Sequence, residues 1–197
     1  YVHDGERPDP PTPHPAPFTP TSPSSSEPNP LLRGCAEDGA TVDIYSQVGC
    51  LGALEATLVA DAEDEQCPTN AAFFGLVAAT PNATTTFYGQ VRNNAGRISA
   101  CVPLGDYLHD ALVPTAPTFA STNPSSPSSL LTPTILGRAE PGVRVVLSSG
   151  ATCEDSLGSG FADSDGTFII IATVAENDGT TIYARATDLT GNASACT

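Results

Sequence analysis

The sequence predicts an all-β protein that contains two tandem copies of one unit. Its 19 prolines and 17 glycines stand mostly between short apolar runs, a pattern typical of strands joined by turns. The stretch 180–196 reads as a strand, a Gly-Asn turn and a cysteine, and a variant of it occurs at 85–101. A chain of 197 residues with such a repeat is expected to fold as two small domains.

The composition of the chain excludes two classes of partner. There are 22 acidic against 7 basic side chains, which gives a net charge of -15. Such a surface repels nucleic acid and anionic lipid, so we expect neither as a partner. No apolar run approaches the roughly 18 residues of a membrane helix, so we expect no membrane insertion. Six cysteines without a Cys-x-x-Cys pair predict a secreted, extracellular protein with disulfides.

The N-terminal segment is expected to be a linker or arm. Residues 1–15 are rich in proline and carry little to bury, which predicts extended, polyproline-like chain. The element Tyr1–Asp4 recurs as Tyr107–Asp110, where it follows a completed domain. By analogy an earlier domain would precede Tyr1, and the alternative is a mature N-terminus that happens to resemble the internal linker.

We expect the first module over residues 16–102, a linker over 103–115 and the second module over 116–197. Each module opens with a Ser/Pro-rich extended segment, enters a glycine turn, and continues as a strand with period-two apolar residues. The middles differ, because the second module has an Asp-Gly hairpin turn where the first has an acidic loop. The two modules align in the same register over this half, because three pairs of residues are each separated by the same number of positions. The pairs are Gly34 and Gly137, Gly39 and Gly142, and Cys50 and Cys153.

The repeat selects one pairing of the six cysteines. Two cysteines of each module occupy corresponding positions, which predicts one bridge within each module. The other two occur only in the first module, and their joint absence from the second indicates that they bond to each other. In the chain-entropy model each long-loop bridge contributes roughly 3–4 kcal/mol. The predicted bridges are Cys50–Cys101, Cys153–Cys196 and Cys35–Cys67.

Three motifs of the second module carry a family resemblance. They are Ser-Pro-Ser-Ser at 126–129, Gly-x-Ala-Glu-x-Gly at 137–142 and Ala-Thr-Asp-x-x-Gly-Asn-x-Ser at 186–194. With them the modules resemble tandem bacterial immunoglobulin-like repeats of large secreted surface proteins, closely over 116–197 and more loosely over 16–102. The resemblance implies a two-sheet Greek-key β-sandwich for each module. It also implies a role as stalk, adhesin or fibre segment.

We expect no enzyme activity and no required cofactor. The second module contains no histidine, lysine or Gly-x-Ser-x-Gly motif, which removes the usual triad and Schiff-base chemistry. His3, His14 and His109 all lie in the expected linkers. Carboxylate pairs occur in turns and loops, and they are not expected to converge from strands across a cleft.

A calcium site is the main alternative to a chain without ligands. Asp163, Asp165 and Asp188 stand at strand ends of the second module, and oxygen ligands suit Ca²⁺. The competing interpretation, which we favour, is that the first two shape a hairpin turn and that Asp188 caps the Gly-Asn turn. Weak cation binding by the acidic loop 61–65 is a further alternative to a solvated charge run.

Two other groups of residues are candidate sites. We expect Tyr107 to pack on a domain face while His109 and Asp110 hydrogen-bond to the backbone and fix the angle between modules, with metal binding by His109 and Asp110 as the alternative. Asn82 and Asn192 stand in glycan acceptor triplets. The Ser/Thr/Pro stretches 19–26 and 121–129 are candidate carriers of O-linked sugar.

The function that this pattern favours is structural. We expect a stalk or fibre segment of an exported bacterial cell-surface protein, whose partners are neighbouring immunoglobulin-like repeats or copies of itself. One alternative is an extracellular filament in which the arm 1–30 contacts the next subunit by strand addition. Another is an adhesin module whose first-module loops bind a surface glycan or protein.

Overall fold

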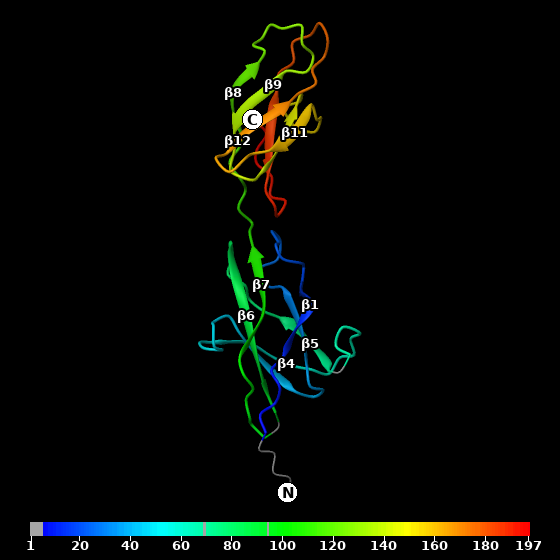
Figure 1. The fold of residues 1–197 in the computed structure, drawn as a ribbon, viewed down its shortest axis with the longest axis vertical. Coiled ribbons are helices and arrows are strands. Elements are labelled where there is room, and N and C mark those ends of the chain that lie inside the picture. Colours follow the sequence, from blue (N-terminus) through cyan, green and yellow to red (C-terminus); the bar gives the residue numbers. More distant parts are fainter. Residues whose placement is uncertain (1–5, 69, 94) are drawn as a thin grey trace. The chain divides into compact units, whose positions relative to one another are not determined.

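The chain forms two compact units of β-strands, residues 1–111 and residues 112–197 (Figure 1). The computed structural model describes residues 6–68, 70–93 and 95–197, so the element Tyr1–Asp4 lies outside the described residues. Every regular element in the described part is a strand, which confirms the prediction of an all-β fold. The described residues include no helix of the length and apolarity that a membrane span requires.

The first unit is a sandwich of two antiparallel sheets. Its apolar side chains alternate along most strands, and the inward-facing ones from both sheets form a single core. One sheet has the order β1 (Thr12–Thr19), β2 (Leu31–Ala36) and β5 (Ala71–Leu76). The other has the order β4 (Leu54–Val59), β3 (Thr41–Tyr45), β6 (Ala83–Arg92) and β7 (Val102–His109).

The second unit repeats this plan with shorter strands. Its own core is formed by apolar side chains of both its sheets, led by Phe168, Leu147 and Ile135. One sheet has the order β8 (Thr118–Asn123), β9 (Thr134–Arg138) and β12 (Thr167–Ile171). The other has the order β11 (Gly158–Phe161), β10 (Arg144–Ser148) and β13 (Tyr183–Thr187).

The same close approach explains one repeated glycine in each unit. A Cβ atom on Gly34 would lie 2.2 Å from Cζ of Phe73, and a Cβ atom on Gly137 would lie 2.2 Å from Cζ of Phe168. Both rings belong to the neighbouring strand of the same sheet and are fully buried. Each glycine therefore makes room for an aromatic ring that lies across its strand.

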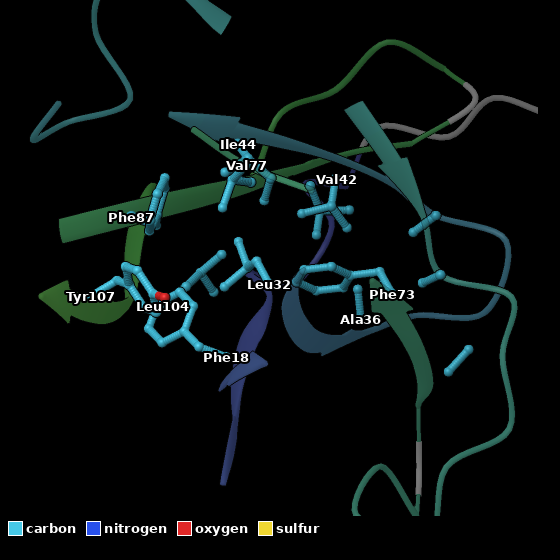
Figure 2. Close-up of a cluster of buried hydrophobic side chains, with 14 of the residues drawn as sticks. Phe18, Leu32, Ala36, Val42, Ile44, Phe73, Val77, Phe87, Leu104 and Tyr107 are labelled. Atoms are coloured by element: carbon cyan, nitrogen blue, oxygen red, sulfur yellow. The ribbon is translucent and has the colours of Figure 1, made fainter. Parts of the chain in front are cut away.

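Two segments expected to be linkers are strands of the first unit. The proline-rich segment enters β1 at Thr12, and residues 103–109 belong to β7. Phe18 of β1 packs against Phe87 and Tyr107, with ring centroids 5.8 and 5.1 Å apart (Figure 2). These segments are ordered because their large apolar side chains complete the core. Residues 12–19 are thus used within their own unit and pair with β2.

Candidate functional site

Three disulfides link the six cysteines. Cα–Cα distances are 5.6 Å for Cys35–Cys67 and 5.8 Å for the two others, within the usual range for a bridge. Cys50 and Cys153 both adopt a positive φ, 55° and 56°, in the turns after β3 and β10. Their partners, Cys101 and Cys196, both follow the turn that closes after β6 or β13. Each unit therefore has one bridge at the same place in the repeat.

The closing turn after these strands is also built alike in both units. In the first unit the Ser99 hydroxyl accepts a hydrogen bond from the Val91 N–H at 2.8 Å and donates to the Ala100 carbonyl. In the second the Ser194 hydroxyl accepts from the Ala186 N–H at 2.9 Å and donates to the carbonyl of the next residue. Both serines are buried. They place the following cysteine for its bridge, a role that the sequence analysis missed although the serine stands in the closing motif.

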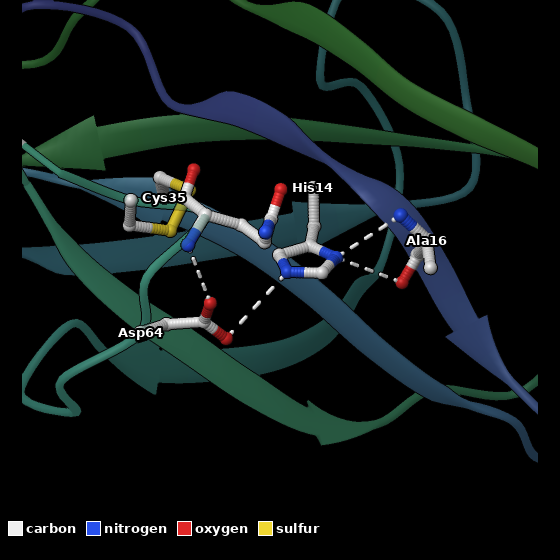
Figure 3. Close-up of a disulfide and its surroundings, with 6 residues drawn as sticks. His14, Ala16, Cys35 and Asp64 are labelled. Atoms are coloured by element: carbon white, nitrogen blue, oxygen red, sulfur yellow. Dashed lines mark hydrogen bonds and ion pairs between the residues drawn. A yellow bond between two sulfur atoms is a disulfide. The ribbon is translucent and has the colours of Figure 1, made fainter.

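The bridge found only in the first unit holds the acidic loop against β2. Cys35, Cys67 and Ala72 form a small buried cluster next to that loop. His14 of β1 lies beside the bridge, with Nε2 3.5 Å from Oδ2 of Asp64 (Figure 3). On the other side of the ring, His14 Nδ1 lies 3.0 Å from both the N–H and the carbonyl oxygen of Ala16. The loop is thus attached to both β1 and β2.

The electrostatics of Asp64 agree with this attachment. The pKa of Asp64 is lowered, chiefly because the Gln66 N–H donates a 2.8 Å hydrogen bond to its carboxylate. Burial acts to raise this pKa, and His14 acts to lower it further. The charged form of Asp64 is therefore the one that the folded loop stabilises. His14 had been expected to lie in a linker, and nothing in its proline-rich context indicated this contact.

A buried carboxylate in the first unit is a second feature that the sequence analysis did not anticipate. Asp43 on β3 is fully buried and forms an ion pair with the half-exposed Arg92 of β6. The Thr57 hydroxyl donates to the other side of the same carboxylate at 3.0 Å. The hydrogen bonds and the charge of Asp43 raise the pKa of Arg92. The pair is specific to this unit, because Val146 and Thr187 stand at the corresponding places of the second.

The three aspartates of the calcium hypothesis lie in two separate turns. Asp163 and Asp165 shape the turn between β11 and β12, where both carboxylates accept hydrogen bonds from the Thr167 N–H at 2.8 Å. The expected hairpin is not formed, because β11 pairs with β10 in one sheet and β12 pairs with β9 in the other. Hydrogen bonds with Thr167, and then with Asp163, lower the pKa of Asp165 to about 2. In the other turn, Asp188 Oδ1 accepts from the N–H groups of Thr190 and Asn192, both at 2.9 Å.

These contacts assign the aspartates to turns. Burial acts to raise the pKa of Asp188, but the hydrogen bonds from Asn192 and Thr190 outweigh it and lower the pKa. Within the described residues no three His, Cys, Asp or Glu side chains are grouped as a metal site would require. The pattern of strand-end aspartates therefore reflects turn formation, and the three residues do not converge on one cation.

The residues expected at the module junction lie inside the first unit. Tyr107 is fully buried in its core and donates a 2.7 Å hydrogen bond to the Glu27 carbonyl. His109 is also buried, and its Nδ1 accepts a hydrogen bond from the Asn82 N–H at 3.0 Å. The backbone N–H of Asp110 donates to the Ser24 carbonyl. The expectation that Tyr107 packs at a junction is therefore wrong, because its strand completes the core of the first unit.

The two candidate glycan acceptors have different surroundings. Asn82 is exposed in a turn with a positive φ of 55°, and its Oδ1 accepts a hydrogen bond from the Ala111 N–H. Asn192 is half-buried, and its Nδ2, the atom that a glycan would modify, donates to Asp188 Oδ2 at 2.8 Å. A glycan on Asn192 Nδ2 would disturb its hydrogen bond to Asp188 in the turn, whereas the side chain of Asn82 lies at the surface.

One comparison with known proteins concerns the second unit. Residues 116–197, less than half of the chain, match the family model described as bacterial Ig domain. A solved structure described as the BSP domain of a biofilm associated protein aligns with 96% of this chain at 13% identity and a TM-score of 0.33, and the chain covers 28% of that structure's length. No curated protein is significantly similar to the chain. The second unit is thus similar in sequence to the bacterial Ig domain family, and it has a two-sheet fold.

Proposed function

We propose that the chain is a non-enzymatic structural segment of an exported bacterial surface protein, a stalk or fibre part built from bridged β-sandwich modules. All six cysteines are in disulfides, which form and persist in oxidising surroundings outside the cytosol. The bacterial Ig domain at 116–197 supports a repeat of a surface protein. The net charge of -15 keeps such modules soluble and opposes nonspecific aggregation.

The observation that carries this proposal is the bridge shared by both units. It joins the turn after β3 to the segment after β6 in the first unit, and the turn after β10 to the segment after β13 in the second. The strands concerned are hydrogen-bonded neighbours in each sheet. A pull on the chain ends can therefore not extend the segment between the bridged cysteines, even after the sheets separate. This gives a stalk resistance to force and to proteolysis.

Protease resistance tests the proposal. The full chain is incubated with a nonspecific protease at neutral pH, with and without prior reduction and alkylation of the cysteines. We expect the oxidised chain to survive many times longer, because bridges restrict the open states that a protease cleaves. Equal survival of the two forms would contradict a role based on the bridges. Specific binding on a glycan array that is lost when the loop 61–70 is shortened would instead favour an adhesin module.

A further inference from the structure

Both units expose large apolar side chains at the same two positions of one strand. Strands β5 and β12 correspond in the repeat, because each carries the buried phenylalanine that lies over the repeated glycine, Phe73 or Phe168. The residues that alternate with these core positions point to solvent. They are Phe74 and Leu76 in the first unit, 55% and 67% exposed, and Ile169 and Ile171 in the second, 66% and 62% exposed. A single exposed apolar residue needs no explanation, but a repeated pair on one strand marks a contact surface.

The loop after β3 provides a contrast. Leu51 lies in this loop and is 65% exposed, as much as the residues on β5 and β12. The bridged cysteines Cys50 and Cys153 align it with Glu154 of the second unit. This loop position is thus apolar in one unit and charged in the other, whereas β5 and β12 keep large apolar side chains at both positions.

A leucine of the central strand extends each exposed pair. On β2, Leu31 lies opposite Leu76, and on β9, Leu136 lies opposite Ile169. Both leucines are half-buried. Residues directly opposite on neighbouring strands project from the same face of a sheet, with Cβ atoms roughly 5 Å apart. Each unit therefore has an outer apolar face, formed by Leu31, Phe74 and Leu76 in the first unit and by Leu136, Ile169 and Ile171 in the second.

The charges on these two sheets differ from those of the chain as a whole. None of the 22 acidic residues lies on β1, β2, β5, β8, β9 or β12. The arginines of these strands are Arg33, opposite Phe74, and Arg138, opposite Thr167. A chain with a net charge of -15 repels its own copies, and this repulsion is reduced at a face that carries arginine and no carboxylate. Charge therefore directs the approach of two copies to these faces.

The backbone edges of β5 and β12 are partly engaged within the chain. In the first unit Ala62 and Ala72 exchange hydrogen bonds of 3.2 and 2.8 Å. In the second the Asp163 N–H donates to the Thr167 carbonyl at 2.9 Å. These groups are not available to a partner strand, so a contact at this place uses the side chains of the outer apolar face.

We propose that the outer apolar faces pack against the same faces of a second copy of the chain. A contact between identical faces is self-complementary about a two-fold axis, so the apolar side chains of one face meet those of the other. Because every copy presents the face twice, two contacts between the same pair of chains reinforce each other. The inference rests on the proposed structural role and names its partner, since stalks that associate in this way stand side by side.

Sedimentation velocity of the oxidised full chain over a wide range of concentrations tests the proposal. We expect the average mass to rise with concentration, and more so in high salt, because salt screens the repulsion between copies. Ile169→Glu should weaken association about tenfold, since it places a charge in the contact. Phe74→Glu should weaken it less, because the acidic loop already lies beside that sheet. Leu51→Glu is the matched control, equally exposed but outside the outer apolar faces, and should leave association unchanged.

Nuclear magnetic resonance covers the case in which association is too weak for sedimentation. Amide shifts followed at rising concentration should change on β5, β9 and β12 and stay constant in the loop after β3. Thermal melts check that each variant remains folded. A chain that is monomeric in high salt and shows no such shift changes would overturn the proposal, as would shift changes confined to other surfaces or equal effects of Ile169→Glu and Leu51→Glu. None of these results bears on protease resistance, so this inference and the proposed function fail separately.

Discussion

The two units share a sandwich plan, a bridge and a buried serine, yet they close their cores differently. In the first, β1 and β7 contribute Phe18, Leu104 and Tyr107, and all three are buried. In the second, the residues of β8 are all exposed. Both units also have a glycine that makes room for an aromatic ring, Gly34 and Gly137, and a turn with a bridged cysteine. The repeat therefore specifies the two central strand pairs of each unit, and in the first unit the outer strands β1 and β7 add three large side chains to the core.

The largest expected difference concerns the aromatic cluster. Phe18→Ala should destabilise the first unit by about 3–5 kcal/mol, because it removes a buried ring and leaves a cavity beside Phe87 and Tyr107. Thr122→Ala at the corresponding place of the second unit should change stability by less than about 0.5 kcal/mol, since that side chain is exposed. Hydrogen exchange measured by mass spectrometry during urea unfolding reports each unit separately. Similar losses in both units would show that the cores are closed alike.

The next effect concerns the bridges. Replacing Cys153 and Cys196 together by alanine should cost the second unit roughly 3–4 kcal/mol and leave it without a covalent link. Replacing Cys35 and Cys67 in the same way should cost a similar amount, but the first unit keeps Cys50–Cys101. Chemical denaturation should therefore show that the second unit unfolds first in the variant without Cys153 and Cys196. In the variant without Cys35 and Cys67, the first unit should still unfold cooperatively. If loss of the Cys153–Cys196 bridge left the stability of the second unit unchanged, this order would be contradicted.

The buried carboxylate allows a sharper comparison. Arg92→Leu should destabilise the first unit by about 1.5–3 kcal/mol, because it leaves Asp43 buried without its charged partner. The double variant Asp43→Val with Arg92→Thr introduces the residues found at these places in the second unit, Val146 and Thr187. We expect the double variant to be more stable than the single one, measured by urea denaturation. A double variant whose loss of stability equals the sum of its two single changes would mean that Asp43 and Arg92 do not stabilise each other.

The smallest effect is a difference in acid sensitivity between the closing turns. Asp188 has a folded-state pKa below its usual 3.8, so the stability from its charged form is present above about pH 4 and is lost as the pH falls through the lower folded pKa. Asn93, at the corresponding place in the first unit, does not titrate, and its Oδ1 accepts from the Arg97 N–H at 2.9 Å. Asp188→Asn should therefore flatten the pH dependence of the second unit as the pH falls below about 4, measured by thermal melts. An unchanged slope would assign that dependence to other carboxylates, such as Asp165.

Much of this fold follows from local sequence signals, and the exceptions have physical causes. The proline and glycine pattern predicted strands, and the repeat pointed to the three cysteine pairs that the structure contains. Strand β7 was missed because the register shifts at Gly105, which has a φ of 153°, so that Leu104 and Tyr107 both face inward without period-two spacing.

The site features missed by the sequence analysis depend on long-range contacts. His14 stands among prolines that indicate a linker, and its contact with Asp64 exists only because β1 pairs with β2 beside the disulfide. Asp43 occupies the polar position of an alternating strand, which predicts a solvent-facing residue. It is buried because Arg92 and Thr57, from the two neighbouring strands, cover it. Neither contact has a signal within a few residues of sequence.

Single-molecule force spectroscopy of the full chain, pulled from its two ends, tests the structural role most directly. In the oxidised protein, unfolding of the second unit should not release the 43-residue span between Cys153 and Cys196. A reductant should then lengthen the extension of that unit by roughly 150 Å, at about 3.5 Å per residue. An extension that is the same with and without reductant would contradict the claim that these bridges hold the modules together under load.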